Sequence, residues 1–364
     1  MPEHKLRIGI TQGDTNGIGW EVILKALADP RMTELFTPVV YGSPKAAAYY
    51  RNTIAEIEPV SFNPVASAAE ARRGKVNLAA CGEGAEIVPG KAAADAGRAA
   101  VEALHAAMRD LKEGHLDAIV TAPFDKETVQ ADDFRYTGHT EYMAAELGGE
   151  SMMIMCSDVL RVGLVTKHIP VSEIARNITK ERIVRDLGTL RRALIEDFGI
   201  VEPRIAVMAL NPHAGDGGLL GREEQEIIRP AIVEAFSKGV LAFGPFAADG
   251  LFAGGGYAKY DGILAMYHDQ GLAPFKSLSP DGVNFTAGLS AVRTSPDHGT
   301  AFDIAGKDKA DPQSMRNAIY AAIDIAEHRR AWAEWTRNPL QRAERDRGGR
   351  DVSVKDLPQT EKED

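Results

Sequence analysis

Short apolar runs alternate with longer amphipathic stretches over most of this chain. The runs are rich in β-branched residues and bounded by turn residues, a pattern that predicts buried strands. These strands are expected at residues 5–11, 38–43, 75–81, 116–123, 160–168, 204–213 and 260–268. Longer segments between them, with apolar residues every three to four positions, predict helices at 17–29, 92–113, 178–198, 222–238 and 314–335. The alternation predicts an α/β fold with a mainly parallel sheet and helices on both of its faces.

The length and the end of the chain add to this picture. With 364 residues, the chain is long enough for two domains. The residues beyond Asn338 are charged, include glycine and offer few apolar side chains. Residues 338–364 are therefore expected to form a mobile polar tail.

Charge and composition exclude several classes of function. The net charge of -10 argues against a nucleic-acid partner, because phosphate backbones require a basic face. No apolar run reaches the roughly 20 residues of a membrane-spanning helix, and the N-terminus lacks a signal-peptide pattern. The two cysteines, Cys81 and Cys156, lie in apolar runs, where we expect buried thiols in a reducing cytoplasm.

Three histidines each follow an apolar run that is predicted to be a strand. They are His168, His213 and His268. Ligands of open α/β sheets bind beyond the carboxyl ends of the strands, and three histidines with an open fourth position form a known catalytic metal site. For any one of them, a capping hydrogen bond to a loop is the better interpretation. Their three equivalent positions favour one shared site.

Two glycine-containing turns precede predicted helices. In TQGDTNGIGWE, Gly13 lets the backbone approach a ligand at a helix N-terminus, although a simple tight turn explains it equally well. Asp14 either contacts that ligand or caps the turn. In YTGHTEYMAAEL, Thr140 is the expected N-cap, and His139 just before it lies where an anion binds. A plain capping turn is the alternative there.

Three later motifs carry further polar residues. The glycine-rich loop LNPHAGDGGLLGREE directly follows a strand, a place where loops approach ligands. AMYHDQGLAPFK places Asp269 next to its histidine and Lys276 downstream, where a lysine binds an anion or transfers a proton. A lone lysine is more often a solvated surface charge. In VRTSPDHGTAFDIAGKDKADP, Arg293 can hold a phosphate or carboxylate through two hydrogen bonds.

These motifs, in this order, resemble the 4-hydroxythreonine-4-phosphate dehydrogenase family of vitamin B6 synthesis. The resemblance runs from residue 7 to about residue 327 and includes GDTNGIGWE, TAPFDKE, YTGHTEY, LNPHAGDGGLLGREE, LAMYHDQGLAPFK and RTSPDHGTA. It implies a two-domain, three-layer α/β/α fold like that of isocitrate and isopropylmalate dehydrogenases, with the active site in the interdomain cleft. The first domain would comprise residues 1–128 and 287–337, and the second, residues 129–286, would carry the metal ligands and dimer contacts.

The resemblance also implies the residues of the site. A divalent metal would bind His168, His213 and His268, with His268 supplied by the partner subunit of a homodimer. Zinc is the favoured ion because imidazoles suit it, and magnesium or cobalt are alternatives. Substrate contacts carry over to His139, Thr140, Lys276, Asn284 and Arg293. NAD is the implied cofactor, with NADP as an alternative, and its contacts are expected at Gly13, Asp14, His298, Gly299 and Asp303.

The implied reaction oxidises 4-phosphooxy-L-threonine at C3 and then decarboxylates the product to 3-amino-2-oxopropyl phosphate. The same reaction on 4-phospho-threonate or 4-phospho-erythronate is the alternative. Lys276 and Asp269 are both candidates for the general base. Thr15, Asn16 and Trp20 depart from the family pattern at the first turn, and we expect these changes to line the cleft and affect the choice of substrate.

Overall fold

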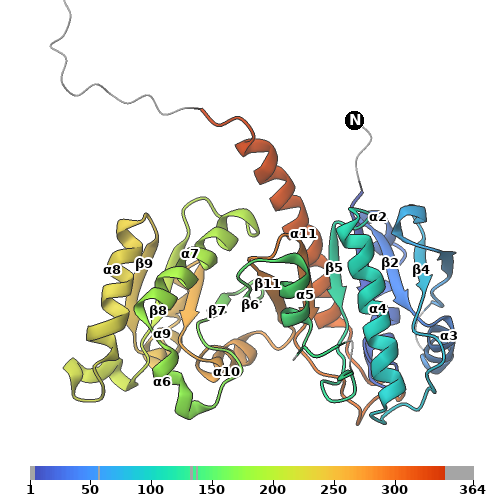
Figure 1. Ribbon diagram of the computed structural model, residues 1–364, viewed down its shortest axis with the longest axis horizontal. Helices are drawn as coiled ribbons and strands as arrows, with labels where there is room; N and C mark the ends of the chain where they lie inside the picture. The colour runs from blue at the N-terminus through green and yellow to red at the C-terminus, as the bar shows by residue number, and fades with distance from the viewer. Residues whose placement is uncertain (1–4, 56–57, 132–133, 137, 341–364) are drawn as a thin grey trace, which may run out of the picture.

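The computed structural model describes residues 5–55, 58–131, 134–136 and 138–340 (Figure 1). Within these residues the strands form one twelve-stranded sheet, in the order β3-β4-β2-β1-β5-β12-β11-β6-β7-β10-β8-β9. The strands are β1 (Arg7–Thr11), β2 (Thr37–Gly42), β3 (Phe62–Val65), β4 (Val76–Ala80), β5 (Ala118–Thr121), β6 (Met152–Cys156), β7 (Arg161–Leu164), β8 (Arg204–Met208), β9 (Leu241–Phe246), β10 (Gly262–Ala265), β11 (Val283–Ala287) and β12 (Val292–Pro296).

Helices connect most of these strands. They are α1 (Gly19–Leu27), α2 (Met32–Leu35), α3 (Pro44–Thr53), α4 (Ala94–Lys112), α5 (His139–Leu147), α6 (Ile174–Asn177), α7 (Lys180–Glu196), α8 (Arg229–Ser237), α9 (Ala248–Ala253), α10 (His268–Leu278) and α11 (Gln313–Thr336). A π-turn, Glu224–Ile228, leads into α8. Short 3-10 turns lie at Ala68–Glu70, Val171–Glu173, Pro212–Gly218 and Gly256–Lys259.

The sheet consists of two parallel blocks joined by antiparallel pairings. Strands β3, β4, β2, β1, β5 and β12 run parallel, and so do β7, β10, β8 and β9. Between the blocks, β11 is antiparallel to both β12 and β6, and β6 is antiparallel to β7. The two blocks therefore point their carboxyl ends in opposite directions. The expected mainly parallel sheet is confirmed, and the reversal at its centre is an addition to it.

Helices cover both faces of the sheet and form a three-layer arrangement. One continuous apolar core joins α1, α3 and α11 to α7 and α8 on one face. On the other face, α4 and α5 pack over the first block, while α9 and α10 pack over the second. Figure 1 shows α3 and β4 at one end of the molecule and α8 and β9 at the other. The opposite face therefore has two separate covers with a gap between them.

Every strand and helix predicted from the pattern is present within a few residues of its expected place. The pattern missed the shorter elements, among them α3, α10 and the central strands β6, β11 and β12. Of the two cysteines, Cys156 is buried as expected, whereas Cys81 is partly exposed. None of the helices in the described ranges is long and apolar enough to cross a membrane.

The domain and tail boundaries remain predictions. The expected boundary after residue 128 assigns α5 to the second domain, although its Tyr142 and Met143 pack in the same cluster as Leu104 of α4. Most of the predicted tail, residues 341–364, lies outside the described residues, as does Thr137 of the YTGHTEY motif.

Candidate active site

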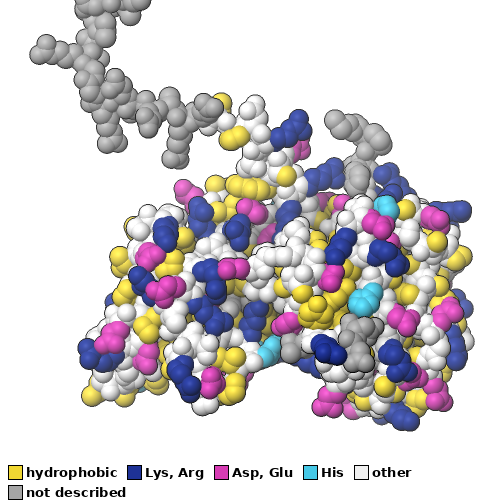
Figure 2. All heavy atoms as spheres, in the orientation of Figure 1, with side chains coloured by type: hydrophobic (Ala, Val, Ile, Leu, Met, Phe, Trp, Pro, Cys, Tyr) yellow, Lys and Arg dark blue, Asp and Glu magenta, His cyan; other side chains and the backbone are white. Residues whose placement is uncertain are grey.

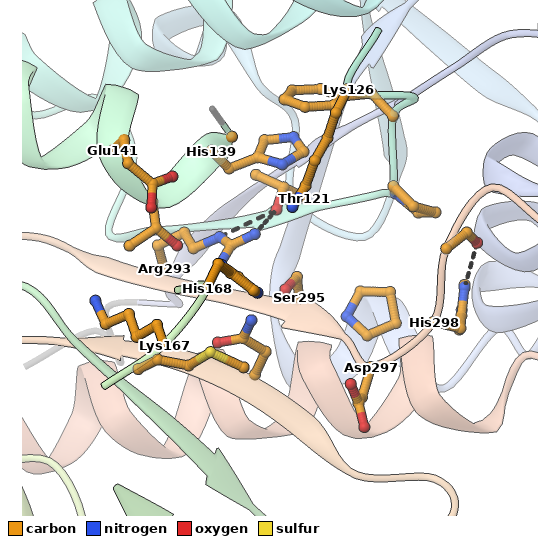
Figure 3. A pocket seen from close by; sticks show the side chains of 18 of the residues that line it. Thr121, Lys126, His139, Glu141, Lys167, His168, Arg293, Ser295, Asp297 and His298 are labelled. Carbon is orange, nitrogen blue, oxygen red and sulfur yellow. Dashed lines mark hydrogen bonds between the residues drawn. The ribbon is translucent and has the colours of Figure 1, made fainter. Parts of the chain in front are cut away.

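A cavity of about 440 Å³ lies on the sheet face between the two helical covers. Its walls come from the loop after β5, the start of α5, the end of β7, the start of α10 and the central strands β6, β11 and β12 (Figure 3). All five expected substrate residues line it: His139, Thr140, Lys276, Asn284 and Arg293. Residues far apart in the sequence thus meet where the two blocks of the sheet join.

Arg293 of β12 is a buried cation in this cavity, only 4% exposed. Its Nε and Nη2 donate to Thr121 Oγ1 at 3.1 and 2.7 Å, and its Nη1 donates to Thr286 Oγ1 at 3.2 Å. Burial lowers the pKa of the guanidinium from 12.5 to about 10. Among the described residues no carboxylate forms an ion pair with it, and neutral hydroxyls do not compensate a buried charge. The arrangement suits an anion that arrives with the ligand.

Other positive groups surround Arg293. Lys126, Lys167 and Lys276 also line the cavity. Lys167 donates from Nζ to Ser151 O at 3.1 Å, and burial lowers the pKa of this lysine. Only two carboxylates belong to the described lining, Glu141 and Asp297, and a positive excess therefore remains when all ordinary charges are counted. Such an excess attracts small molecules with more than one negative group.

Two of the three strand-end histidines share this cavity. The ring centroids of His168 and His268 are 5.4 Å apart within one chain. Burial, helped by the positive charge of Lys126, lowers the pKa of His168 and favours the neutral imidazole that binds metals. His268 begins α10, and its Nδ1 lies 2.7 Å from Asp269 Oδ1. A carboxylate at one ring nitrogen orients the other toward a ligand.

His213 is not brought to the cavity. It lies exposed in the turn Pro212–Gly218, where five consecutive residues, His213 to Gly217, have φ between 42° and 79°. This left-handed run follows Leu210 and Asn211, whose backbone N–H groups donate to Glu224 Oε1. One chain therefore assembles His168 with His268, whereas the resemblance assigned His268 to the partner.

His139 and Thr140 differ from their expected places at the start of α5. The N-cap residue is Gly138, and the helix begins at His139, so Thr140 is not the N-cap. The His139 ring stacks on Phe124, with centroids 3.7 Å apart and planes inclined by 19°. Burial and the nearby charges of Arg293 and Lys126 lower its pKa well below the ordinary value. His139 is therefore a neutral hydrogen-bonding group beside the buried cation.

The predicted nucleotide contacts divide into two groups. His298 and Gly299 line the cavity, whereas Gly13, Asp14 and Asp303 do not. The two segments still touch, because Ile18 N donates to Thr300 O at 3.0 Å. Asp14 is fully buried, and burial raises its pKa to about 6.

The departures in the first turn have a structural role instead of the expected place in the cleft. Trp20 is fully buried and donates from Nε1 to Gln12 Oε1 at 3.0 Å. Asn16 accepts from Val88 N and donates to Lys91 O, which fixes the loop between β4 and α4. Neither these two residues nor Thr15 lines the cavity. The expectation that these positions shape the substrate site is therefore wrong for this cavity.

Asp269 does not face the cavity, so its predicted role as a general base has no geometric support. Its side chain is 86% exposed and is paired with His268. If His168 and His268 hold a metal ion, replacing Asp269 by alanine should remove the orienting carboxylate and raise the metal concentration needed for half-maximal activity by roughly 10- to 100-fold. A metal titration of activity measures this, with Glu202→Ala at an exposed turn as the control. An unchanged titration would show that Asp269 does not support His268.

A second group of potential metal ligands lies elsewhere in the described chain, at Asp110, Glu113 and His115. Asp110 Oδ2 already accepts hydrogen bonds from the Tyr41 hydroxyl and from Ala68 N. These bonds join α4 to the neighbouring strand and loop, and we regard the group as structural.

Comparisons with known proteins identify the family of this chain. A family model described as pyridoxal phosphate biosynthetic protein PdxA matches residues 34–322. The chain belongs to the PdxA family. It is 53% identical to a 4-hydroxythreonine-4-phosphate dehydrogenase of Bacteroides thetaiotaomicron, over 94% of each chain. It is 37% identical to a Cutibacterium acnes relative provisionally named D-threonate 4-phosphate dehydrogenase, over 90% of this chain and 95% of that one.

Solved structures of PdxA proteins share the fold. The crystal structure of 4-hydroxythreonine-4-phosphate dehydrogenase from Klebsiella pneumoniae superimposes with a TM-score of 0.77 at 35% identity, covering 90% of this chain and 99% of that one. A family of dehydrogenases named for phosphorylated substrates fits a cavity with a buried cation and excess positive charge.

Sequence reasoning missed several residues of the cavity, namely Thr121, Lys126, Glu141, Lys167 and Asp297. All of them stand beside residues that were singled out or inside motifs that were quoted. The sequence marked these residues only by their proximity to a motif. Proximity in the sequence does not show whether a side chain points into the cavity.

Proposed function

We propose that the protein oxidises 4-phosphooxy-L-threonine at C3 with NAD and then decarboxylates the resulting 3-keto acid to 3-amino-2-oxopropyl phosphate. The observation that carries this proposal is the buried Arg293, whose hydrogen bonds to described residues all go to threonine hydroxyls and which lies in the cavity that also holds His168 and His268. This arrangement supports a substrate whose anionic group binds close to a centre that His168 and His268 can coordinate. The PdxA relatives named for this substrate support the same choice.

The donor set fits a divalent metal ion. Neutral imidazoles suit zinc and other transition ions better than magnesium, although oxygens of the substrate also suit magnesium or cobalt. His168 and His268 would hold the ion, and Asp269 would keep the imidazole ring of His268 in position. When bound, the ion supplies Lewis-acid stabilisation of negative charge on the substrate oxygen.

The third metal ligand is proposed to come from a second copy of the chain. His213 lies exposed on a turn whose left-handed backbone directs it outside its own cavity. An exposed histidine on such a turn is available to a neighbouring molecule, and the predicted homodimer supplies one. In this arrangement, His168 and His268 of one chain are two of the metal ligands, and His213 of the partner subunit is the third.

The remaining residues of the cavity position the substrate. Arg293 and Lys276 bind its negative groups, and the His139 and Asn284 side chains offer hydrogen bonds. The Nζ of Lys276 lies 3.1 Å from Asp297 Oδ1, and the two side chains form an ion pair. Lys276 is therefore better suited to bind an anion, or to protonate the product of decarboxylation, than to act as a base. His298 and Gly299 lie at the cavity edge, where a nicotinamide dinucleotide would enter.

NADH formation tests this function directly. We expect the purified protein to reduce NAD in the presence of 4-phosphooxy-L-threonine and a divalent ion, and to release carbon dioxide in equal amount. A chelator should stop the reaction, and added zinc should restore it. Turnover that persists after complete removal of the metal would rule out the metal-assisted mechanism, and absence of turnover with every divalent ion would rule out the substrate.

A further inference from the structure

Two carboxylates line the cavity, and they differ in what they already bind. Asp297 pairs with Lys276 at 3.1 Å, and its second oxygen is buried. Glu141 has no ion-pair or hydrogen-bond partner among the described residues, although both cations and imidazoles lie near it. The carboxylate of Glu141 is therefore available to a positive group that arrives with a ligand.

The place of Glu141 directs it into this space. It is the third residue of α5, and its Oε2 folds back over Gly138, where it would lie 3.3 Å from a Cβ added there. It lines the main cavity and also an adjoining hollow of about 400 Å³ that contains Lys167 and His168. In Figure 3 its side chain points from the start of α5 toward Arg293 and His168.

Glu141 also lies near the buried cation of the cavity. Its negative charge acts on Arg293 and raises the pKa of that guanidinium against the effect of burial. His168 is one of the two imidazoles proposed to hold the metal at the C3 oxygen of the substrate. The next carbon, C2, carries the one positive group of 4-phosphooxy-L-threonine.

We propose that Glu141 binds the C2 ammonium group of the substrate and thereby selects the amino acid over the corresponding hydroxy acid. The inference rests on the proposed function and adds to it the residue that distinguishes the two substrate classes. 4-Phospho-threonate has a hydroxyl at C2, which forms a neutral-donor hydrogen bond in place of a charge-assisted one. A preference for the ammonium compound therefore needs a negative group at this position.

Two structural roles compete with this one. A glutamate at the third helical position can cap the helix start, and any carboxylate here reduces repulsion among the cations. Glu141→Gln separates the capping role from substrate selection, because glutamine keeps the length and the capping capacity but has no charge. A general loss of negative charge should affect both substrates alike, whereas a lost ammonium partner should affect the amino acid alone. Asp297→Asn is the matched control, since it removes the other carboxylate of the same cavity.

The test measures kcat/KM for NADH formation and equilibrium binding with both 4-phosphooxy-L-threonine and 4-phospho-threonate. In Glu141→Gln we expect kcat/KM for the amino acid to fall roughly 10- to 100-fold, the range for a lost hydrogen bond between charged groups, while the value for the hydroxy acid stays constant or rises. Asp297→Asn should change both substrates by similar factors. The ratio of the two substrates is thus the diagnostic quantity.

Each outcome has one meaning. Equal losses for both substrates in Glu141→Gln would overturn the selection role and leave a structural or electrostatic one. An unchanged ratio with unchanged rates would show that the ammonium binds elsewhere. Wild-type protein that binds and oxidises neither compound would refute the proposed function itself, a result visible before any variant is compared.

Discussion

Replacing Arg293 by methionine is expected to lower kcat/KM by roughly thirty- to five-thousandfold while making the free protein more stable. The loss follows because the substrate anion would enter the cavity without its buried partner, and removing one member of such a pair costs about 2 to 5 kcal/mol. The guanidinium donates three hydrogen bonds, all to threonine hydroxyls, that hold it ready for the anion. Its effect on binding should therefore be large.

The gain in stability follows from the same burial. The pKa of Arg293 falls from 12.5 to about 10, which corresponds to an unfavourable contribution on the order of 3 kcal/mol whenever the group is charged in the folded protein. Below pH 10 the folded state keeps this charge, and so the cost applies throughout the neutral range. Methionine is apolar and unbranched and should relieve part of it, raising the free energy of unfolding by on the order of 1 kcal/mol or more.

Thermal unfolding with and without inorganic phosphate measures the stability and the anion binding together, and a steady-state assay measures kcat/KM. Phosphate should raise the melting temperature of the wild-type protein and leave that of Arg293→Met unchanged, because a ligand stabilises only the protein that binds it. Arg293→Lys serves as the control, since it keeps the charge but loses the planar guanidinium. The rise in its melting temperature on adding phosphate should fall between those of the wild-type protein and of Arg293→Met. Wild-type kcat/KM in Arg293→Met would show that the substrate anion binds elsewhere. A lower melting temperature of this variant would show that Arg293 stabilises the fold.

The sequence was sufficient for the parts of this fold that depend on local periodicity. Long amphipathic helices such as α4 and α11, and β-branched runs such as β1 and β8, carry their period within a few turns of chain. The antiparallel pairings at the centre of the sheet could not be predicted from the sequence, because the pairing of β11 with β6 and β12 depends on contacts between distant segments. For the same reason α10 was missed, since Gly271 and Pro274 weaken its helical pattern while its packing on the second block stabilises it.

The site was predictable where strand ends alone position a side chain. His168 and His268 follow neighbouring parallel strands, β7 and β10, so the end-of-strand argument brought them together. His213 follows β8, also adjacent to β10, yet a run of left-handed residues turns it away. The backbone of a glycine-rich loop is decided by few side-chain constraints, and its direction could not be inferred from spacing. The role of Glu141 was hidden for another reason, because it depends on α5 facing β7 across the cavity.

Mixing histidine variants is expected to identify which imidazole crosses the subunit interface. Replacement of His168, His213 or His268 by alanine should each lower activity by roughly a thousandfold or more, because the metal loses one of three protein ligands. The three arrangements of the site then differ in which inactive variants restore each other when their subunits are mixed. Complementation is measured as NADH formation after co-expression of two variants with different affinity tags.

If His213 is the ligand from the partner subunit, a dimer of one His168→Ala chain and one His213→Ala chain has one site with two damaged ligands and one intact site. Random mixing makes half of the dimers mixed, so about a quarter of the sites recover. The pair His268→Ala and His213→Ala should recover equally, whereas His168→Ala with His268→Ala should not. Within one chain the two rings lie 5.4 Å apart, and this proximity is the reason for expecting that pattern.

The other arrangements give different patterns with the same three mixtures. If His268 crosses the interface, as the family resemblance implies, then His268→Ala restores both other variants, while His168→Ala with His213→Ala stays inactive. If all three ligands come from one chain, no mixture recovers, because each site of every mixed dimer lacks one histidine. Metal content provides an independent reading, since a restored site should retain one ion per mixed dimer. Recovery only in mixtures that contain His213→Ala is therefore the result that would assign the exposed turn Pro212–Gly218 to the neighbouring active site.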